Sequence, residues 1–162
     1  MNPAYQKAFD AYDRCIDTIR FLADTANRVL RSRNSSERID DDTILFNFDA
    51  ILQYSLMQVA VNDYEFSVQE ARFLKDLAQY CDFCDYLESI SDKLVNWDLF
   101  LNCNASAIKE LLELDSICED IRDKAEALSA LFAMIDAVTP DTDYYESFKN
   151  DFFKIYYYVF WI

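Results

Sequence analysis

The chain has 162 residues with no Gly, no His and a formal net charge of −15, and 52% of it is hydrophobic. This apolar content predicts a folded protein, whereas the missing glycines exclude phosphate-cradling loops, dinucleotide-binding loops and nucleophile elbows of the usual kind. Without His there is no Ser-His-Asp or Cys-His catalysis and no imidazole metal ligand. Composition therefore predicts a binding or scaffolding protein that is not an enzyme.

The charge is distributed unevenly along the chain. Residues 1–38 contain 7 Lys/Arg and 5 Asp/Glu, whereas residues 39–162 contain 8 and 25, so the first segment carries +2 and the second −17. An acidic body of this kind repels nucleic acid and anionic membranes at physiological salt. We therefore expect a protein partner and no direct binding to nucleic acid.

The first predicted element is an amphipathic helix over residues 4–32. Its large apolar residues recur three and four positions apart, which is the period of one helical face. We expect this face to pack on the rest of the fold, mainly through Phe9, Tyr12, Ile16, Ile19 and Leu22. Residues 33–42 contain many turn formers and few large apolar residues, so they are predicted to be a linker.

Capping boxes predict where the later helices begin. In each box a small polar residue is followed three positions later by Glu, an arrangement that satisfies two free backbone N–H groups. The four pairs are Ser67/Glu70, Asp85/Glu88, Ser116/Glu119 and Asp143/Glu146. With Asp42 or Thr43 and Ser106 as further starts, helices are predicted near 43–62, 67–81, 85–95, 105–114, 116–138 and 143–160. The sequence thus predicts an all-α fold, a single compact domain over 1–162 with about seven helices.

Two segments of the chain are loosely similar to each other. Each consists of an apolar helix, a short acidic turn and a capped helix; the first reads VAVNDYEFSVQEARFLKDLAQYCDF over 59–83, and a weaker copy covers 131–153. This pattern resembles the TerB-like family, which is associated with tellurite resistance and stress response, over about residues 43–160. The resemblance implies a core of two pseudo-repeated helical hairpins at 43–162, preceded by an extra helix and linker at 1–42, with no enzymatic activity.

The resemblance also implies acidic positions that bind a divalent cation such as calcium or magnesium. Carried over by position, these are Asp63 and Glu70 in the first copy and Asp136 and Glu146 in the second. The residues themselves also fit a second interpretation, in which Ser67 and Glu70 form a capping box without any ion. A true EF-hand loop is excluded, because its first ligand positions would fall on Val59 and Val61.

Five cysteines are present, at positions 15, 81, 84, 103 and 118. This odd number, together with the lack of a secretory signal, predicts a reduced, cytoplasmic protein. Cys81 and Cys84 form a CxxC motif, but a zinc site is disfavoured because Cys103 and Cys118 are fifteen residues apart and no knuckle glycine follows. We expect at least one of this pair to pack as a small hydrophobe.

The C-terminal segment 152–162 is apolar on nearly all sides. A helix of this kind is buried on several sides or leaves a face for a partner. Core packing is the preferred interpretation, and a partner surface, including a homodimer through this helix, and contact with a membrane surface are the alternatives. Its longest apolar run, 155–162, has eight residues, against about twenty for a transmembrane helix, so no membrane span is expected.

Together these observations predict a non-catalytic helical module of a bacterial stress-response or tellurite-resistance type system, which acts through protein contacts and could bind a divalent cation weakly. The alternative is an acidic inhibitor or immunity-type protein that engages a basic partner or mimics nucleic acid. A carboxylate metalloenzyme is disfavoured, because such helical bundles use Glu-x-x-His pairs. The three classes differ in whether the carboxylates converge on one point or spread over an exposed face.

Overall fold

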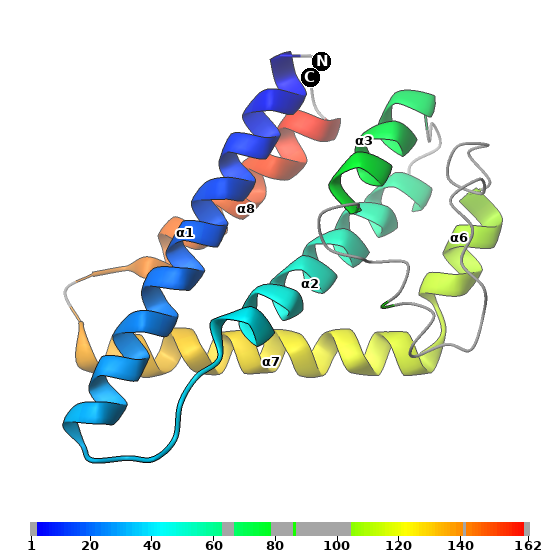
Figure 1. Cartoon of the computed structure of the whole chain (residues 1–162). Coiled ribbons are helices and arrows are strands. Elements are labelled where there is room, and N and C mark those ends of the chain that lie inside the picture. Colours follow the sequence, from blue (N-terminus) through cyan, green and yellow to red (C-terminus); the bar gives the residue numbers. More distant parts are fainter. Residues whose placement is uncertain (1–2, 63–66, 79–85, 87–104, 141, 161–162) are drawn as a thin grey trace. The chain divides into compact units, whose positions relative to one another are not determined.

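The computed structural model describes residues 3–62, 67–78, 86, 105–140 and 142–160. Over these ranges the regular elements are six helices and no strand is present (Figure 1): α1 (Pro3–Ser32), α2 (Asp41–Asn62), α3 (Val68–Ala78), α6 (Ala105–Leu112), α7 (Asp115–Val138) and α8 (Tyr144–Phe160). The all-α prediction is confirmed for the described residues. Apart from Tyr86, the predicted helix 85–95 lies outside them together with its Asp85/Glu88 cap, so the count of about seven helices stays a prediction.

Packing divides the chain into two compact units. Unit 1 comprises Met1–Phe46 and Glu126–Ile162, and unit 2 comprises Asn47–Ala125. The divisions fall inside α2 and α7, so α1 and α8 belong to unit 1, whereas α3 and α6 belong to unit 2. The organisation as a single domain over 1–162 stays a prediction.

The starts of α3 and α8 are closed by side chains at the predicted positions. At α3 the capping box is complete: Ser67 N–H donates to Glu70 Oε2 (3.3 Å), and Glu70 N–H donates to Ser67 Oγ (3.1 Å). At α8, Glu146 N–H donates to Asp143 Oδ1 at 2.8 Å. Each cap of this kind contributes about 1 kcal/mol to stability, which is why the sequence signal locates these two helix starts well.

The start of α2 lies at Asp41, two residues before the predicted position, because Asp40 caps the helix. The N–H of Asp42 donates to Asp40 Oδ1 at 3.3 Å, and Thr43 Oγ1 donates to Asp40 Oδ2 at 2.9 Å. Asp41 and Asp42 then lie in the first turn, where the helix dipole favours negative charge. The run of three aspartates is therefore a helix start.

The predicted cap of α7 at Ser116 is wrong, because α7 begins at Asp115 and Ser116 lies inside its first turn. The backbone N–H groups of Ile117 and Cys118 both donate to the carbonyl of Leu114. A backbone turn directly after α6 therefore starts the helix, and no side chain at Ser116 is needed for it. An acidic residue in the first turn, here Asp115, also suits the positive end of the helix dipole.

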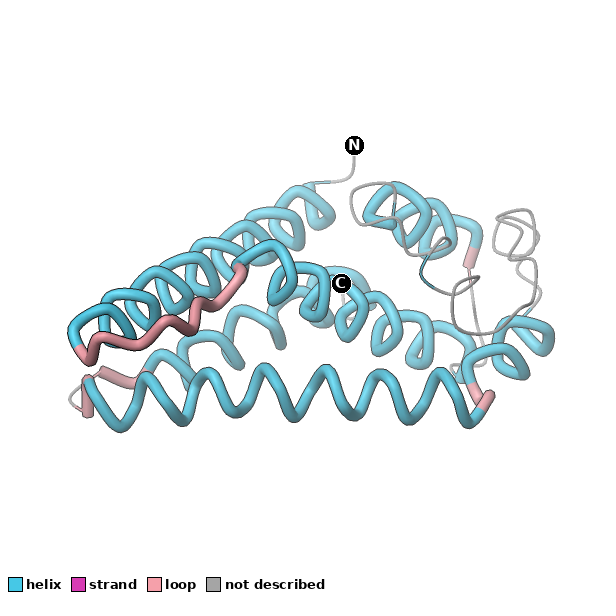
Figure 2. The backbone as a smooth tube through the Cα atoms, turned by 60° about the horizontal axis from the view of Figure 1, so that its bottom comes forward, coloured by secondary structure: helices cyan, strands magenta, loops and turns pink. Residues whose placement is uncertain are grey.

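The end of α1 is a Schellman turn built without glycine. Asn34 has a φ of 55°, in the left-handed region that glycine usually occupies. Its N–H donates to the Arg31 carbonyl at 3.0 Å, and the N–H of Ser35 donates to the Leu30 carbonyl at 3.0 Å. Both bonds satisfy carbonyls that the helix end leaves free. The turn sends the linker back along α1 (Figure 2).

Unit 1 is built on the antiparallel packing of α1 against α8, which lie side by side in Figure 1. Contacts fix the register at both ends of the pair: Lys7 Nζ lies 5.6 Å from the Tyr158 ring centroid, and the Phe21 and Tyr144 rings are 5.2 Å apart. The N-terminal helix therefore packs on the fold, as its apolar period predicts.

The centre of this contact differs from the predicted face. The buried positions of α1 are mostly small: Ala8, Ala11, Cys15, Ile19, Leu22, Ala23 and Ala26. Phe9, Tyr12 and Ile16 are only half-buried. Small side chains let two helix backbones come close, and larger rings are then left to the margins of the contact. Of the predicted face, Ile19 and Leu22 lie in the buried stripe.

Unit 2 is organised around α2, whose buried side chains include Phe48, Leu52, Leu56 and Met57. Among the described helices, Asp41–Asn62 is the one long and apolar enough to cross a membrane by length and composition, and half of its most apolar window is buried inside the structure. Core helices that are apolar on all sides have the same composition. The expectation that the chain lacks a membrane span stays a prediction.

We expect Asn34→Gly to stabilise the protein by about 0.5–1 kcal/mol, because glycine adopts the left-handed conformation without steric cost. Asn34→Ala should destabilise it by about 1 kcal/mol. Denaturant midpoints measure both changes. The control is Ala130→Gly at an exposed position within α7, where glycine should cost about 0.5–1 kcal/mol. A loss of stability in Asn34→Gly would contradict the turn.

Candidate functional site

The four carboxylates predicted to bind a cation are distributed over both units. Asp63 lies outside the described residues, Glu70 is in unit 2, and Asp136 and Glu146 are in unit 1. Asp136 is exposed near the end of α7. The convergence of Asp63 and Glu70 with Asp136 and Glu146 on one cation therefore stays a prediction.

Both predicted glutamates already have partners. Glu70 accepts from the Ser67 N–H in the α3 cap, and Glu146 Oε1 forms an ion pair with Lys149 Nζ at 2.9 Å. The hydrogen bond to Glu146 raises the pKa of Lys149. Within the described ranges, no group of three or more Cys, Asp or Glu side chains is arranged to hold a metal ion. The CxxC pair and Cys103 fall outside those ranges.

A buried polar network in unit 2 centres on the Tyr54 hydroxyl. It donates to the Leu112 carbonyl at 3.1 Å, accepts from Gln58 Nε2 at 2.9 Å and lies 3.4 Å from Cys118 Sγ. Burial, together with the contact to Cys118, raises the pKa of Tyr54 to about 12. The hydroxyl stays protonated at neutral pH and ties α2 to the end of α6 and the start of α7.

A second cluster in unit 2 joins Tyr86, Asp120 and Lys124. The Tyr86 hydroxyl donates to Asp120 Oδ2, and Lys124 Nζ lies 3.6 Å from the same oxygen. Lys124 Nζ also donates to Asn47 Oδ1 at 3.3 Å and lies 5.6 Å from the Tyr86 ring centroid. Burial raises the pKa of Tyr86 well above its usual value. A phenol held protonated in this way cannot act as a base near neutrality.

In unit 1, Arg14 and Asp151 form the main charged contact between α1 and α8. Arg14 Nε lies 2.9 Å from Asp151 Oδ1, and the hydrogen bond raises the pKa of Arg14. Asp151 is 9% exposed, whereas half of the Arg14 side chain faces solvent. Solvent screens the attraction, so the main role of Arg14 is to donate a close hydrogen bond to a buried carboxylate, whose other cation, Lys154 Nζ, lies 3.9 Å away.

Cys15 lies next to this ion pair and is fully buried. Its thiol points to the Phe148 carbonyl at a distance of 4.0 Å. Burial raises its pKa to about 12, which is the opposite of the lowered pKa that activates a nucleophilic cysteine. Cys15 therefore fills the helix contact as a small apolar residue.

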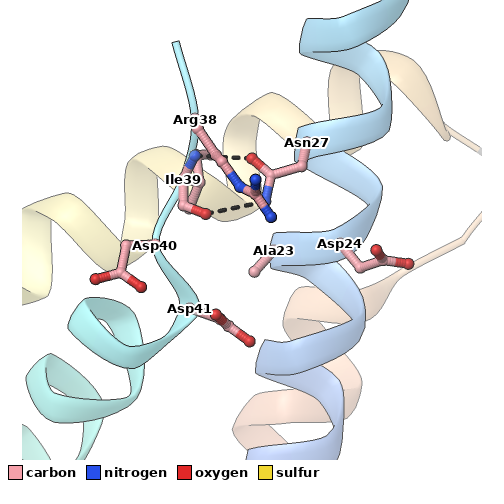
Figure 3. A pocket seen from close by; sticks show the side chains of 7 residues that line it. All are labelled: Ala23, Asp24, Asn27, Arg38, Ile39, Asp40 and Asp41. Carbon is pink, nitrogen blue, oxygen red and sulfur yellow. Dashed lines mark hydrogen bonds between the residues drawn. The ribbon is translucent and has the colours of Figure 1, made fainter.

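Two hollows lie where the linker runs back beside α1. The larger, of about 450 Å³, is lined by Ala23, Asp24, Asn27, Arg38, Ile39, Asp40 and Asp41 (Figure 3). The smaller, of about 220 Å³, shares Asp24, Asn27 and Arg38 and adds Arg31, Ser35, Ser36 and Glu37. Asn27 fixes the linker here, because its amide accepts from Ile39 N–H at 2.7 Å and donates to the Ile39 carbonyl at 2.9 Å.

Sequence reasoning missed these hollows. They depend on contacts between residues twelve positions apart, such as Asn27 and Ile39, and no motif marks such a pair. The one available signal is compositional. Arg28, Arg31, Arg33 and Arg38 all fall within eleven residues of a chain that is otherwise strongly acidic.

The exposed side of α8 carries large apolar side chains. Phe153 is 65% exposed and Tyr157, one turn later, is 47% exposed. Tyr145 near the start of the helix is also exposed, with Lys149 Nζ 4.7 Å from its ring centroid. The opposite side of α8 contributes Phe148, Ile155 and Val159 to the core. The helix thus has a buried face and an aromatic outer face, here called the α8 outer face (Tyr145, Phe153, Tyr157).

We expect stability to fall as pH rises above about 9, partly through Cys15. Its pKa is raised from 9.0 to about 12 in the folded state, so between these values the unfolded chain loses a proton that the folded chain keeps, and unfolding is favoured. The melting temperature measured against pH checks this. Cys15→Ala should show a shallower decline over the same interval, whatever its melting temperature at neutral pH, and an equal decline would show that Cys15 is not the source.

Comparison of the sequence with protein-family models, with curated proteins and with solved structures finds no match. The resemblance to the TerB-like family therefore depends on the residues of the motif in this sequence.

Proposed function

We propose that this chain is a non-catalytic helical module that acts by binding another protein, and that the α8 outer face is the contact surface. The observation that carries the proposal is the exposure of Phe153 and Tyr157 on neighbouring turns of one helix. Large exposed aromatic side chains are enriched in protein interfaces, where a few of them supply most of the binding energy. A second copy of the chain is the partner that this surface suits first, because an apolar helix face can pair with itself by a two-fold axis.

The shifted pKa values support a role without catalysis. The pKa values of Cys15 and Tyr54 are both raised to about 12, mainly by burial. Catalytic thiols and bases need pKa values brought towards neutrality. These described groups are shifted away from it, as expected of side chains that serve packing and hydrogen bonding.

The proposal also includes the more specific features that the TerB-like resemblance implies. They are a core of about seven helices with two related hairpins, a place in a bacterial stress-response or tellurite-resistance type system in the cytoplasm, and weak binding of calcium or magnesium by Asp63, Glu70, Asp136 and Glu146. The short acidic turns of the sequence support them. The competing role of Glu70 is its hydrogen bond in the α3 cap, where Oε2 accepts from the Ser67 N–H.

A second candidate function is an acidic inhibitor or immunity-type protein that engages a basic partner. It is favoured by exposed carboxylates on α6, α7 and the turn between them: Glu110, Glu113, Asp115, Glu119 and Asp123. Three of these, Asp115, Glu119 and Asp123, are four residues apart, which is a rise of about 6 Å per step along one helix face. Carboxylates spread in this way suit a positively charged surface better than a single ion.

We expect the wild-type chain to self-associate in sedimentation velocity experiments over a concentration series, and Phe153→Ser to weaken this by about tenfold, because truncating a central aromatic costs about 1–2 kcal/mol. The matched control is Val68→Ser, which removes a 48% exposed apolar side chain from unit 2.

A monomeric wild-type chain, or equal loss in both variants, would contradict self-association through the α8 outer face. Charge reversal at Glu119 and Asp123 distinguishes the second candidate. This double change should leave self-association unaltered and abolish salt-sensitive binding to a basic protein if the acidic surface is the functional one.

The cation proposal predicts that calcium, magnesium or manganese raises the melting temperature at constant ionic strength. Free ion at about 100 times Kd should add about 2.7 kcal/mol of stability. Asp63→Asn should remove the effect, and sodium at matched ionic strength serves as the screening control. Identical shifts for all salts and for the variant would mean that the carboxylates act only as caps and surface charges.

A further inference from the structure

We propose that the smaller hollow between α1 and the linker is a binding site for a phosphate-type oxyanion, held by the guanidinium groups of Arg31 and Arg38. The hollow has a volume of about 220 Å³, and a water molecule takes about 30 Å³ of liquid, so a tetrahedral anion fits with part of its hydration shell. This inference does not depend on the α8 outer face or on any cation site.

The two arginines reach the hollow from different elements. Arg31 lies in the last turn of α1, and Arg38 comes from the linker. Figure 3 shows the Arg38 side chain extending from the linker towards α1 and ending beside Asn27. Planar guanidinium groups offer pairs of N–H donors that match the spacing of phosphate oxygens. Two of them that line one hollow can bind such an anion together.

The carboxylates that line the hollow do not cancel this charge. Asp24 Oδ2 is already bound to Arg28 Nη2 at 2.6 Å, and Figure 3 shows Asp24 pointing away from Arg38. With Asp24 paired to Arg28, the other charged residues that line the hollow are Arg31, Arg38 and Glu37, a balance of +1. Asp40 and Asp41 line the larger hollow next to it, so the excess of positive charge is confined to the smaller one.

The carbonyls at the end of α1 are hydrogen-bonded, which weakens their repulsion of a nearby anion. Free carbonyls at a helix C-terminus repel negative charge, but the carbonyls of Leu30 and Arg31 accept hydrogen bonds from Ser35 and Asn34. Ser35 Oγ accepts from the Glu37 N–H at 3.1 Å, which leaves its own hydrogen to donate. The hydroxyl of Ser36 also lines the hollow. Neutral donors therefore accompany the two arginines.

The linker is held in place before any ligand arrives. Asn27 binds both the N–H and the carbonyl of Ile39, and Asp40 caps α2 immediately after it. Arg38 is thus presented from a fixed backbone, which lowers the entropy cost of binding. This preorganisation distinguishes the hollow from a chance group of surface arginines.

The size of the ligand follows from electrostatics. The parts of a polyanion that lie more than a Debye length of about 8 Å from Arg31 and Arg38 are screened from these two charges, and where they approach the acidic remainder of the chain they are repelled. A single phosphate group inside the hollow meets mainly Arg31 and Arg38. The ligand is therefore a compact phosphate group, and it can come from free phosphate and small phosphate esters or from a phosphorylated side chain of a peptide.

The test is calorimetric titration of the full-length chain with inorganic phosphate, with chloride at the same ionic strength as reference. Phosphate should bind and chloride should not, and Arg31→Gln and Arg38→Gln should each weaken phosphate binding by about tenfold. The matched control is Arg20→Gln, which removes the same charge from an exposed position of α1 that does not line the hollow. All three positions are exposed, so the variants should fold.

A phosphoserine peptide and its unphosphorylated form identify the source of the phosphate. Tighter binding of the phosphopeptide than of inorganic phosphate, lost in Arg38→Gln, supports a phosphorylated protein, and equal or weaker binding supports a free phosphate compound. The proposal is overturned if phosphate binds no better than chloride, or if Arg20→Gln weakens it as much as Arg31→Gln and Arg38→Gln.

Discussion

The absence of glycine is the constraint on which much of this structure depends. A chain without glycine must form its tight turns with residues that have a Cβ atom, and the turn after α1 places Asn34 at a φ of 55°. Asparagine is one of the few residues that enters this region readily, because its short polar side chain can bond locally. Asn27 and Asp40 then fix the rest of the linker by side-chain bonds. The position of Arg38 beside α1 is a consequence of these three residues.

Local signals in the sequence predicted the bounds of the described helices to within a few residues, because helix ends are decided by short-range hydrogen bonds. Ser67, Glu70 and Asp143 form the bonds that their spacing predicts. The face of α1 that packs on α8 was predicted less well. Periodicity identifies that a helix has an apolar side, but α1 has two adjacent stripes, one of small residues such as Ala11 and one of aromatic residues such as Tyr12. The close approach of α8 selects the small one.

The candidate sites show why residue types alone do not predict function. A carboxylate near a helix start can be a cap or a ligand, and the sequence is the same in both cases. In the structure Glu70 bonds to the Ser67 backbone, and Glu146 pairs with Lys149. The hollow beside α1 was not predictable in the same way, because it forms only when the Schellman turn brings Arg38 back to Asn27. Considered one at a time, the residues that line the hollow are ordinary turn formers and surface charges.

The two units differ in charge, and this difference bears on the choice of partner. Unit 1 contains 9 Lys/Arg and 14 Asp/Glu, a net charge of −5, whereas unit 2 contains 6 and 16, a net charge of −10. A basic partner is therefore attracted more strongly to unit 2, where exposed carboxylates follow α7. Unit 1 has the weaker negative electrostatic field, and it also contains the exposed aromatic side chains of α8 and the arginines at the end of α1. An apolar contact and a compact anion are both better accommodated by the unit with less negative charge, and that is unit 1.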